Sequence, residues 1–575
     1  MRKLLYFSGF ALLLAACSPD PEIPDVPGNG GKDPTKDLAI TATIADDTLV
    51  FRSGDGIGIF VTREDGGQYG DIGGNIKAQY DNGWKSASAM PLSGEPARIY
   101  AYYPFVAGAT AKAVPVLTDG KTPVLYGSAD KNASLNDNAA SIKMGHALSV
   151  VGFNFVKKDY YGAGRLEKVE ILNGPGKAVL ASRGTLDCTT GIITPIPEDT
   201  AKVVKDCKLT QYDEYSNIRL GLLKFPLIRS IAEDIPGKGN TQYLRVLPMV
   251  VKNDGDIIYR FTIDGVAYTC PVKAGIEWKQ GETHIYDFSL EGVSVDFNTC
   301  FSEIIFAGPG DEELSHRYDF VTFPEEAKPA ILQAMKIWAQ CLDIKVPIKM
   351  KVGFAPLNGA AAVAPVGSSY IGENRDLRYT DALLNQIVGY DYNPYSTEMI
   401  IVFNPNTWWY FGLDGKYQEN MFDESWGEAT TDLLSTTLHE MCHSFGFSST
   451  IHPNMNEEIG TKALPQPLDM DIFGSFMVDG QGRSLKDYPN NSKELYDVLV
   501  SGQIAFAGPN AVQANGGKPV LMDDNKPNPA WNTSHLGGFN IMASGEYHHP
   551  GTIIMAMMQD IGWKIKPLPI VREIK

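Results

Sequence analysis

The chain has 575 residues, of which 43% are hydrophobic and 21% are charged, as expected for a folded protein long enough for several domains. Its 50 basic and 68 acidic residues give a net charge of −18, which argues against nucleic acid or an anionic membrane surface as a partner. The 26 tyrosines, 25 phenylalanines, 57 glycines and 36 prolines favour β-rich structure with many turns.

The first 16 residues have the pattern of an export signal. Arg2 and Lys3 precede an apolar stretch, residues 4–14, which is too short to span a bilayer. The stretch ends in Leu-Ala-Ala-Cys at Cys17 and resembles a bacterial lipobox, in which the chain is cut before the cysteine and the cysteine is lipidated. Ordinary cleavage at the same Ala-rich site is the alternative. We expect an outer-membrane lipoprotein anchored through Cys17, surface-exposed or, alternatively, facing the periplasm.

Residues 17–38 are rich in proline, glycine and charged residues, and this composition predicts a solvated tether without a core. The chain contains no other run of 18 apolar residues, so we expect no other membrane span. The six cysteines after Cys17 are too sparse for a disulfide scaffold, and their pairing stays open.

Short β-type runs, separated by Gly, Asp, Asn and Pro, fill residues 39–292 and predict β-sandwich domains. No long segment of helical periodicity interrupts them. The clearest runs are Gly56–Val61, Arg98–Tyr103, Val150–Phe155, Val169–Leu172 and Ile257–Phe261.

Four segments of this region resemble, in their order, the fimbrillin-like lipoproteins of the Bacteroides group. They are Gly54–Phe60, Tyr100–Pro104, His146–Ser149 and Gly281–Phe288. The resemblance implies two tandem sandwiches, which we place at residues 39–140 and 141–292, with a role in display, binding or spacing. A propeptide that imposes latency is the alternative. His146 is interpreted as a packed residue.

From residue 293 to the C-terminus the pattern changes to alternating strands and helices. We predict a strand at Tyr318–Phe323, a helix that starts at Pro324, and further strands at Ile348–Phe354 and Glu398–Phe403. The last strand is nearly continuously apolar, as expected for a strand covered on both faces. This order predicts an α/β lobe.

The motif His-Glu-x-x-His occupies residues 439–443. Histidines four residues apart lie one helical turn apart and can bind one metal ion, while Glu440 points to the side, within reach of a metal-bound water. The preceding residues support a helix: Thr430, Thr431 and Asp432 are N-cap candidates, and an apolar stripe lies opposite the histidines. This stripe consists of Leu434, Leu438, Met441 and Phe445. Cys442 is expected to be a small core residue.

A zinc site for hydrolysis needs a third protein ligand. The compact spacing would require a histidine at position 449, where the chain has Ser449. His535 is the better candidate. His548, His549 and His452 are the alternatives.

The motif helix, the distant His535 and the segment around Met542 together resemble a leishmanolysin-type metzincin over residues 293–575. The family has a long insertion before its third histidine, which here corresponds to residues 444–534. The resemblance implies an α+β metallopeptidase domain, a Met-turn at Met542 and a final helix around 556–563.

These features predict a lipid-anchored zinc endopeptidase that cleaves protein or peptide substrates. His439, His443 and His535 would bind one Zn²⁺, and Glu440 would act as general base and then acid. The alternatives are a fimbrillin-like surface adhesin or scaffold with an inactive peptidase lobe, and an amidase acting on sugar-linked peptides. Calcium is a weaker expectation, near Asp469, Asp471, Asp523 and Asp524. The natural substrate, the oligomeric state and the role of the N-terminal half stay open.

Overall fold

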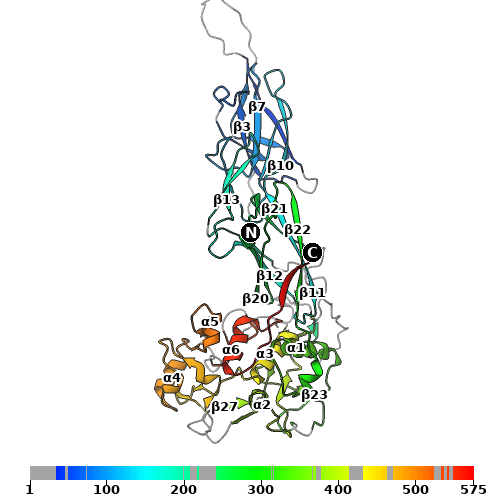
Figure 1. Cartoon of the computed structure of the whole chain (residues 1–575), viewed down its shortest axis with the longest axis vertical. Coiled ribbons are helices and arrows are strands. Elements are labelled where there is room, and N and C mark those ends of the chain that lie inside the picture. Colours follow the sequence, from blue (N-terminus) through cyan, green and yellow to red (C-terminus); the bar gives the residue numbers. More distant parts are fainter. Residues whose placement is uncertain are drawn as a thin grey trace, which may run out of the picture.

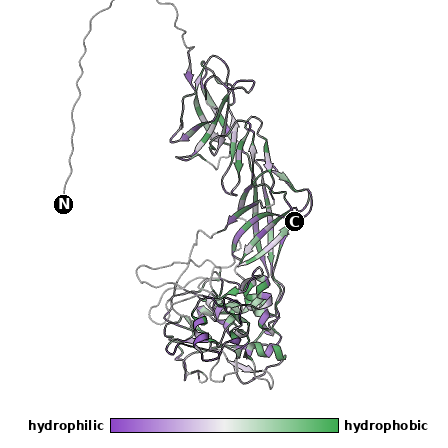
Figure 2. Cartoon of the chain, turned by 90° about the vertical axis from the view of Figure 1, so that its left-hand side faces the viewer, coloured by the Kyte–Doolittle hydropathy of each residue, from purple (hydrophilic) through white to green (hydrophobic). Residues whose placement is uncertain are grey.

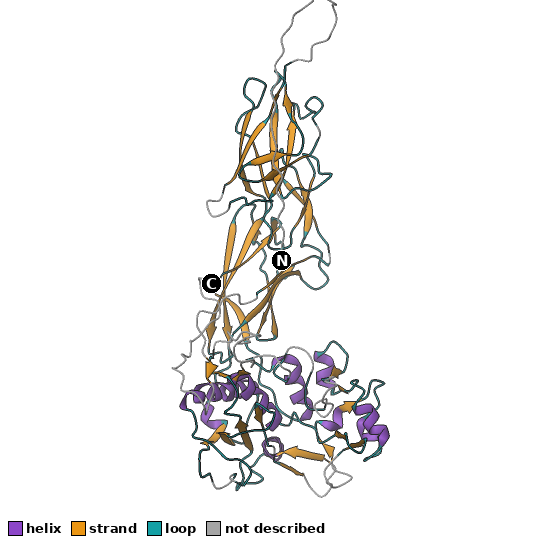
Figure 3. Ribbon diagram, turned by 180° about the vertical axis from the view of Figure 1, so that it is seen from behind, coloured by secondary structure: helices purple, strands orange, loops and turns teal. Residues whose placement is uncertain are grey.

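Two β-sheet regions and one mixed lobe follow one another along the long axis of the molecule (Figure 1). Among the described residues, every α-helix belongs to the lobe at one end (Figure 3). The computed structural model describes residues 34–574 apart from 46–49, 73, 163, 199, 208–216, 219–240, 312–313, 315, 366, 371–376, 414–430, 463–469, 524–532, 537–539 and 543–547. Within these residues, no helix has the length and apolar character needed to cross a membrane.

The first region is built around a seven-stranded sheet in the order β2-β10-β9-β7-β3-β4-β5. In β10, buried and exposed side chains alternate, as expected for a strand with one face on a core. A small antiparallel pair, β1 and β6, lies beside this sheet. The strands are β1 (Lys36–Asp37), β2 (Ala39–Ile44), β3 (Gly56–Thr62), β4 (Ile76–Tyr80), β5 (Trp84–Ser86), β6 (Pro91–Leu92), β7 (Arg98–Tyr103), β9 (Leu125–Ser128) and β10 (Ala139–His146).

The second region is a sandwich of two four-stranded sheets, β17-β11-β22-β37 and β15-β12-β19-β20. Aromatic residues of both sheets, including Phe153, Phe261 and Phe288, meet in its core. Hydrophobic and hydrophilic residues are mixed along the strands of both regions (Figure 2). The strands are β11 (Ser149–Lys158), β12 (Leu166–Asn173), β15 (Lys202–Asp206), β17 (Gln242–Val246), β19 (Ile257–Ile263), β20 (Val266–Pro271), β22 (Thr283–Glu291), β37 (Ile570–Ile574), and the pair β18 (Met249–Val250) and β21 (Glu277–Trp278).

A third, three-stranded sheet joins the two regions. Its strands are β8 (Val114–Leu117), β13 (Arg183–Leu186) and β14 (Ile193–Ile196). Their buried side chains share a small core with Tyr102 of β7 and Leu247, so both regions contribute to it. Because β10 still belongs to the first sheet, the change of sheet falls between His146 and Ser149, a few residues beyond the boundary expected near residue 140.

The C-terminal strand β37 pairs with β22 rather than with any strand of the terminal lobe. The register runs antiparallel from Asp287 opposite Ile574 to Glu291 opposite Ile570. Val571 is buried in the core of the second sandwich. The chain therefore passes through the terminal lobe and returns to complete the second sandwich, an arrangement that the expected domain range 293–575 does not contain.

The terminal lobe is organised around the sheet β23-β24-β28-β25. The first three strands of this sheet are parallel. They are β23 (Phe301–Phe306), β24 (Ile348–Phe354) and β28 (Met399–Phe403), with β25 (Ala362–Val363) antiparallel at the edge. Almost all residues of β24 and β28 are buried, as expected for strands covered on both faces. The expected strand at Tyr318–Phe323 is wrong: this segment is irregular, and β23 takes the place in the sheet.

The described part of the lobe contains six α-helices: α1 (Lys328–Cys341), α2 (Asp381–Val388), α3 (Leu433–Ser444), α4 (Lys493–Leu499), α5 (Pro509–Ala514) and α6 (Gly551–Ile561). Short 3-10 helices are η1 (Phe297–Thr299), η2 (Glu325–Ala327), η3 (Gly474–Phe476) and η4 (Leu485–Asp487). Small sheets complete it, formed by β16 (Asn217–Ile218), β29 (Trp409–Tyr410) and β30 (Thr431–Asp432); β26 (Ser368–Tyr370), β27 (Leu377–Thr380) and β33 (Met470–Asp471); β31 (His452–Asn454) and β32 (Ile459–Thr461); and β34 (Met477–Val478), β35 (Ala505–Phe506) and β36 (Val520–Leu521).

Helix α1 fixes the lobe to the second sandwich through the buried side chain of Gln340. Its Nε2 donates to the carbonyl oxygens of Asp159 at 2.6 Å and Val293 at 2.8 Å, and its Oε1 accepts from the amide of Tyr161 at 3.0 Å. Gly292 passes so close that a Cβ there would lie 2.1 Å from the Asp159 carbonyl oxygen. The junction is therefore closely packed and hydrogen-bonded.

Candidate metal centre

Helix α3 begins and ends as its local sequence predicts. Asp432 is the N-cap, and its Oδ1 accepts from the amide of Ser435 at 2.8 Å. The apolar stripe expected on this helix is fully buried, and Trp338 of α1 donates from its indole nitrogen to the carbonyl of Leu438 at 3.2 Å. At the other end, Gly446 has φ +108°, a conformation that glycine adopts without strain, so the chain turns away just after His443.

The structure brings His439, His443 and His535 together. One ring nitrogen of each histidine lies within 4.8 Å of the corresponding nitrogens of the other two. Nε2 of His439 and Nε2 of His443 are 3.1 Å apart. Two nitrogens at about 2.0–2.1 Å from one Zn²⁺ with tetrahedral angles would be separated by about 3.3 Å. The spacing of the α3 pair therefore fits a shared zinc ion.

Backbone carbonyls fix which nitrogens of the α3 histidines face each other. Nδ1 of His439 lies 2.6 Å from the carbonyl oxygen of Ile541, and Nδ1 of His443 lies 2.7 Å from that of Phe447. Because a carbonyl oxygen only accepts hydrogen bonds, each Nδ1 carries the proton. In the neutral rings each Nε2 is left with a lone pair, which is the form that a metal ion binds.

Burial keeps these rings neutral. Desolvation, and then the neighbouring His535, lowers the pKa of His439 to about 4. Burial also lowers the pKa of His443 well below its usual range, and His439 and His535 add to this effect. Two neutral Nε2 atoms cannot hydrogen-bond to each other without a proton between them. A cation between the rings would resolve this close approach.

His535 reaches the other two histidines because its short segment is pinned on several sides. Its carbonyl oxygen accepts from the amide of Asp523 at 3.0 Å, and the following residue, Leu536, donates its amide to the carbonyl of Met542 at 3.0 Å. The side chain of Met542, the residue predicted to form a Met-turn, is fully buried. Met542 is thus hydrogen-bonded through its backbone to the residue that follows His535.

Glu440, the predicted general base, is almost fully buried on α3. Burial raises the pKa of its carboxyl group to about 8, and a hydrogen bond with the backbone of Ala364 opposes the shift. In the metal-free protein this group is therefore largely protonated at neutral pH. A divalent ion nearby would favour the carboxylate.

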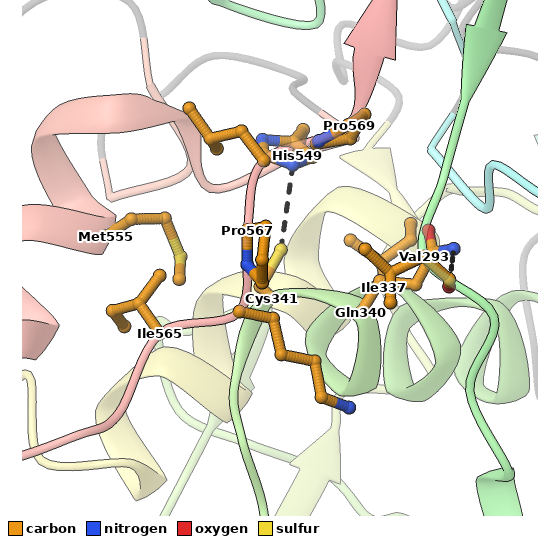
Figure 4. Close-up of a pocket in the computed structure, with 11 residues that line it drawn as sticks. Val293, Ile337, Gln340, Cys341, His549, Met555, Ile565, Pro567 and Pro569 are labelled. Carbon is orange, nitrogen blue, oxygen red and sulfur yellow. Dashed lines mark hydrogen bonds between the residues drawn. The ribbon is translucent and has the colours of Figure 1, made fainter.

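The alternative third ligands lie elsewhere and have other partners. His452 faces Thr461 across the β31–β32 hairpin, with Nε2 3.2 Å from its hydroxyl. His548 places Nε2 3.0 Å from Oδ2 of Asp432, the residue that caps α3. His549 lies beside a small pocket between α1 and the chain before β37, where its Nε2 is 3.6 Å from Sγ of Cys341 (Figure 4).

The acidic residues expected near calcium do not form a site among the described residues. Asp471 is buried, and both of its carboxylate oxygens accept hydrogen bonds from protein donors. Asp523 uses its amide to bind the carbonyl of His535. Asp469 and Asp524 lie outside the described residues, as does Cys17.

Several contributors to the centre carry no side-chain signature that sequence reasoning could use. The carbonyls of Ile541 and Phe447 orient the rings through the backbone alone. The pairing of Asp432 with His548 joins residues far apart in the chain. Only the cap position of Asp432 was visible, as one of three candidates.

Comparison of the chain with known families gives a match in its N-terminal part. Residues 41–300 match a family model described as Fimbrillin-like. No curated protein matches the chain. Similar solved structures include a protein described as a cell adhesion protein from Bacteroides uniformis ATCC 8492 (18% identity, TM-score 0.31, 45% of this chain and 94% of that chain). Others are a fimbrial protein from Bacteroides vulgatus ATCC 8482 (13%, 0.26, 44% and 95%) and the tip fimbrial protein Mfa3 from Porphyromonas gingivalis with C-terminal truncation (11%, 0.24, 44% and 95%).

These comparisons correct the functional prediction. The sequence predicts a zinc metalloendopeptidase of the metzincin type, but the family model that matches the chain, over residues 41–300, is described as Fimbrillin-like. The prediction of a hydrolase is therefore wrong. The motif on α3 sets the positions of two imidazoles, but their positions alone do not establish that the protein turns over a substrate. Of the expected two-part resemblance only the first part is supported: residues 41–300 match the fimbrillin-like family model.

Proposed function

We propose that this chain is a surface-anchored adhesin or scaffold, in which two fimbrillin-like sandwiches carry a metal-binding lobe. The observation that supports this most directly is the match of residues 41–300 to the fimbrillin-like family. The sheet regions and the lobe follow one another along the long axis, which suits a spacer with a terminal head (Figure 3). Anchoring through a lipidated Cys17, at the outer membrane, would place this head away from the membrane.

An exposed group of tyrosines supports a contact role for the lobe. Tyr390, Tyr392 and Tyr395 follow α2 and are 59%, 47% and 98% exposed. Lys349 of β24 is hydrogen-bonded to this loop: its Nζ donates to the carbonyl of Pro394 at 2.8 Å. Tyrosines on a rigid loop bury much area on contact and lose little conformational freedom. Helix α2, which precedes this loop, lies at the end of the molecule opposite the seven-stranded sheet (Figure 1).

The metal ion that suits the three histidines is Zn²⁺, because imidazole nitrogens in a four-coordinate arrangement are its usual ligands. His439 and His443 would hold it through their Nε2 lone pairs, and His535 through one of its ring nitrogens. In this proposal the bound ion supplies a cross-link between α3 and the segment of His535, and Glu440 is a buried neighbour on the same helix. The ion would thereby stiffen the head that carries the tyrosine loop.

Adhesion of cells that display the full chain tests the proposal. The probes are surfaces coated with mucin and monolayers of cultured epithelial cells. We expect displayed wild-type chain to increase adhesion over cells without it, and a Tyr390→Ser, Tyr395→Ser double variant to lose most of the increase. Tyr243→Ser is the matched control, because Tyr243 is 41% exposed on the second sandwich.

Two results would overturn the proposal. One is no gain in adhesion on either surface by wild-type chain whose display is verified with an antibody. The other is hydrolysis of casein by purified chain that a chelator abolishes and that Glu440→Ala removes, since this would restore an enzymatic role. Inductively coupled plasma mass spectrometry of the purified chain reports bound zinc separately from both outcomes.

A further inference from the structure

Asp471 is a buried carboxylate at the end of β33, only 7% exposed, and it lies between two segments of the metal-binding lobe. Its Oδ2 accepts hydrogen bonds from the amide of Thr450 at 2.7 Å, the hydroxyl of Thr450 at 2.9 Å and the hydroxyl of Ser449 at 3.2 Å. Its Oδ1 accepts from the amide of Gly474. The carboxylate therefore ties down the segment that leaves α3 after His443.

That segment in turn holds the residues immediately before His535. The amide of Ser449 donates to the hydroxyl of Ser534 at 3.3 Å. The hydroxyl of Thr533, which is 1% exposed, donates to the carbonyl of Ile451 at 2.7 Å. Residues 449–451 are thus bonded to Asp471 on one side and to residues 533–534 on the other.

The geometry at Asp471 requires two accepting oxygens. Four donors converge on it, and an amide side chain would replace one acceptor by an NH₂ group that faces another donor. The backbone of Gly474 packs closely against this carboxylate: a Cβ at Gly474 would lie 2.8 Å from the Ser449 hydroxyl and 3.0 Å from Oδ2 of Asp471. Burial raises the pKa of Asp471, and the hydrogen bonds from Thr450, Gly474 and Ser449 oppose that effect.

We propose that Asp471 is a positioning residue for the metal centre, which sets the place of His535 through Ser449, Thr450 and the 533–534 segment. The proposal rests on the proposed zinc site, because the third imidazole matters only if an ion is bound. The other two ligands share α3, so the helix sets their relative position, and the carbonyls of Ile541 and Phe447 set the orientation of their rings. The segment of the distant third ligand is held by its backbone bonds with Asp523 and Met542 and, on its N-terminal side, by the network that Asp471 anchors.

Zinc and cobalt binding to the full chain test this assignment. Outer-shell hydrogen-bond partners of metal ligands typically contribute about 10–100-fold to metal affinity. Because Asp471 acts on His535 through residues 449–451 and 533–534 and not directly, we expect Asp471→Asn to weaken zinc binding by about 10-fold, the lower end of that range, in competition with a chromophoric chelator. We also expect the visible absorption of the Co²⁺-substituted protein to change in intensity and position, because the third imidazole no longer meets the ion in a fixed geometry.

Asp479→Asn is the matched control. Asp479 is 6% exposed in the same lobe and accepts from the amides of Gln481 and Arg483, both at 2.8 Å, and from the hydroxyl of Tyr488 at 2.6 Å. Loss of its hydrogen bonds should lower the melting temperature of the metal-free chain but leave zinc affinity and the Co²⁺ spectrum unchanged. A melting temperature alone would not separate the two residues.

Equal zinc affinities of the Asp471→Asn and Asp479→Asn proteins would overturn the positioning role. If Asp471→Asn does not fold, Ser534→Ala carries the test: it removes only the link to the Ser449 amide, and an unchanged zinc affinity in this variant overturns the assignment. Failure of wild-type chain to bind zinc at all would refute the metal centre itself, and the positioning role with it. These outcomes are distinct, because only the last appears in the unmodified protein.

Discussion

The return of β37 to the second sandwich predicts that a substitution near the C-terminus weakens a domain that lies hundreds of residues earlier in the chain. Val571 is 9% exposed and packs into the core of that sandwich, whereas its neighbour Ile570 is 54% exposed. Val571→Ala removes two buried methyl groups, worth about 1.6 kcal/mol at about 0.8 kcal/mol each. For a unit of about 150 residues this lowers the melting temperature by about 3–6 °C.

Hydrogen exchange of the amides in β22, followed with increasing urea, is the assay that locates the effect. The amides of β22 that face β37 should exchange faster in Val571→Ala, because the strand that covers them detaches more readily. Ile570→Ala is the control in the same strand, with an expected cost below about 0.5 kcal/mol for an exposed side chain. Equal effects of the two substitutions, or a loss of protection confined to the terminal lobe, would refute the placement of β37.

Three further predictions concern the terminal lobe. Zinc should stabilise the chain by about 2.7 kcal/mol at a hundredfold excess over its Kd, and calorimetry of His535→Ala should show no such gain. In the metal-free chain, burial lowers the pKa of His549 from 6.5 to about 4, so its neutral form stabilises the fold above pH 6.5. Between pH 6.5 and pH 4 the unfolded chain binds a proton at His549 and the folded chain does not. The free energy of unfolding therefore falls by about 3 kcal/mol over this range. Urea midpoints of His549→Phe should show a shallower loss than wild type, while those of His316→Phe, at an exposed site, should not. Asp432→Ala removes the N-cap of α3, which should lower stability by about 1–2 kcal/mol and also lower zinc affinity. Ser492→Ala removes the N-cap of α4 and should lower stability alone. Chelator titration and thermal melts of both variants measure the two effects.

Local signals in the sequence predicted the elements that depend on local physics. Helix α3 has a side-chain cap, an apolar stripe and a terminal glycine within a few residues, and all three occur as expected. The strand at Ile348–Phe354 was predicted to the residue, and its apolar residues alternate with Lys349, Lys351 and Gly353 over its whole length, which is the period of a strand. Tyr318–Phe323 shows the limit of this reasoning: its aromatic residues pack against the sheet without joining it, and β23, a less regular run, forms the strand.

Placement of distant segments depended on information that periodicity does not contain. Nothing in Ile570–Ile574 distinguishes a strand of the terminal lobe from a strand of the second sandwich, since both would bury one side chain and expose its neighbours. The orienting contacts of the metal centre are equally hidden, because the carbonyls of Ile541 and Phe447 belong to residues whose side chains play no part. A contact that a residue makes through its backbone carbonyl leaves no trace in the identity of that residue.

The prediction of hydrolysis failed at a different step, between ligand geometry and function. Three imidazoles around one ion also serve a protein that cleaves nothing, because the ion would close a loop of the 91 residues 444–534 between His443 and His535. A covalent cross-link across a loop of about 100 residues raises the free energy of the unfolded chain by about 4.7 kcal/mol, because it lowers the conformational entropy of that chain. A tightly bound ion lowers the same entropy. In the terminal lobe the segments 449–451 and 533–534 already meet through the hydrogen bonds of Ser449 with Ser534 and of Thr533 with Ile451, and the ion would add a third connection. A binding head that must keep an exposed tyrosine loop in place would therefore use the same three histidines for stiffness.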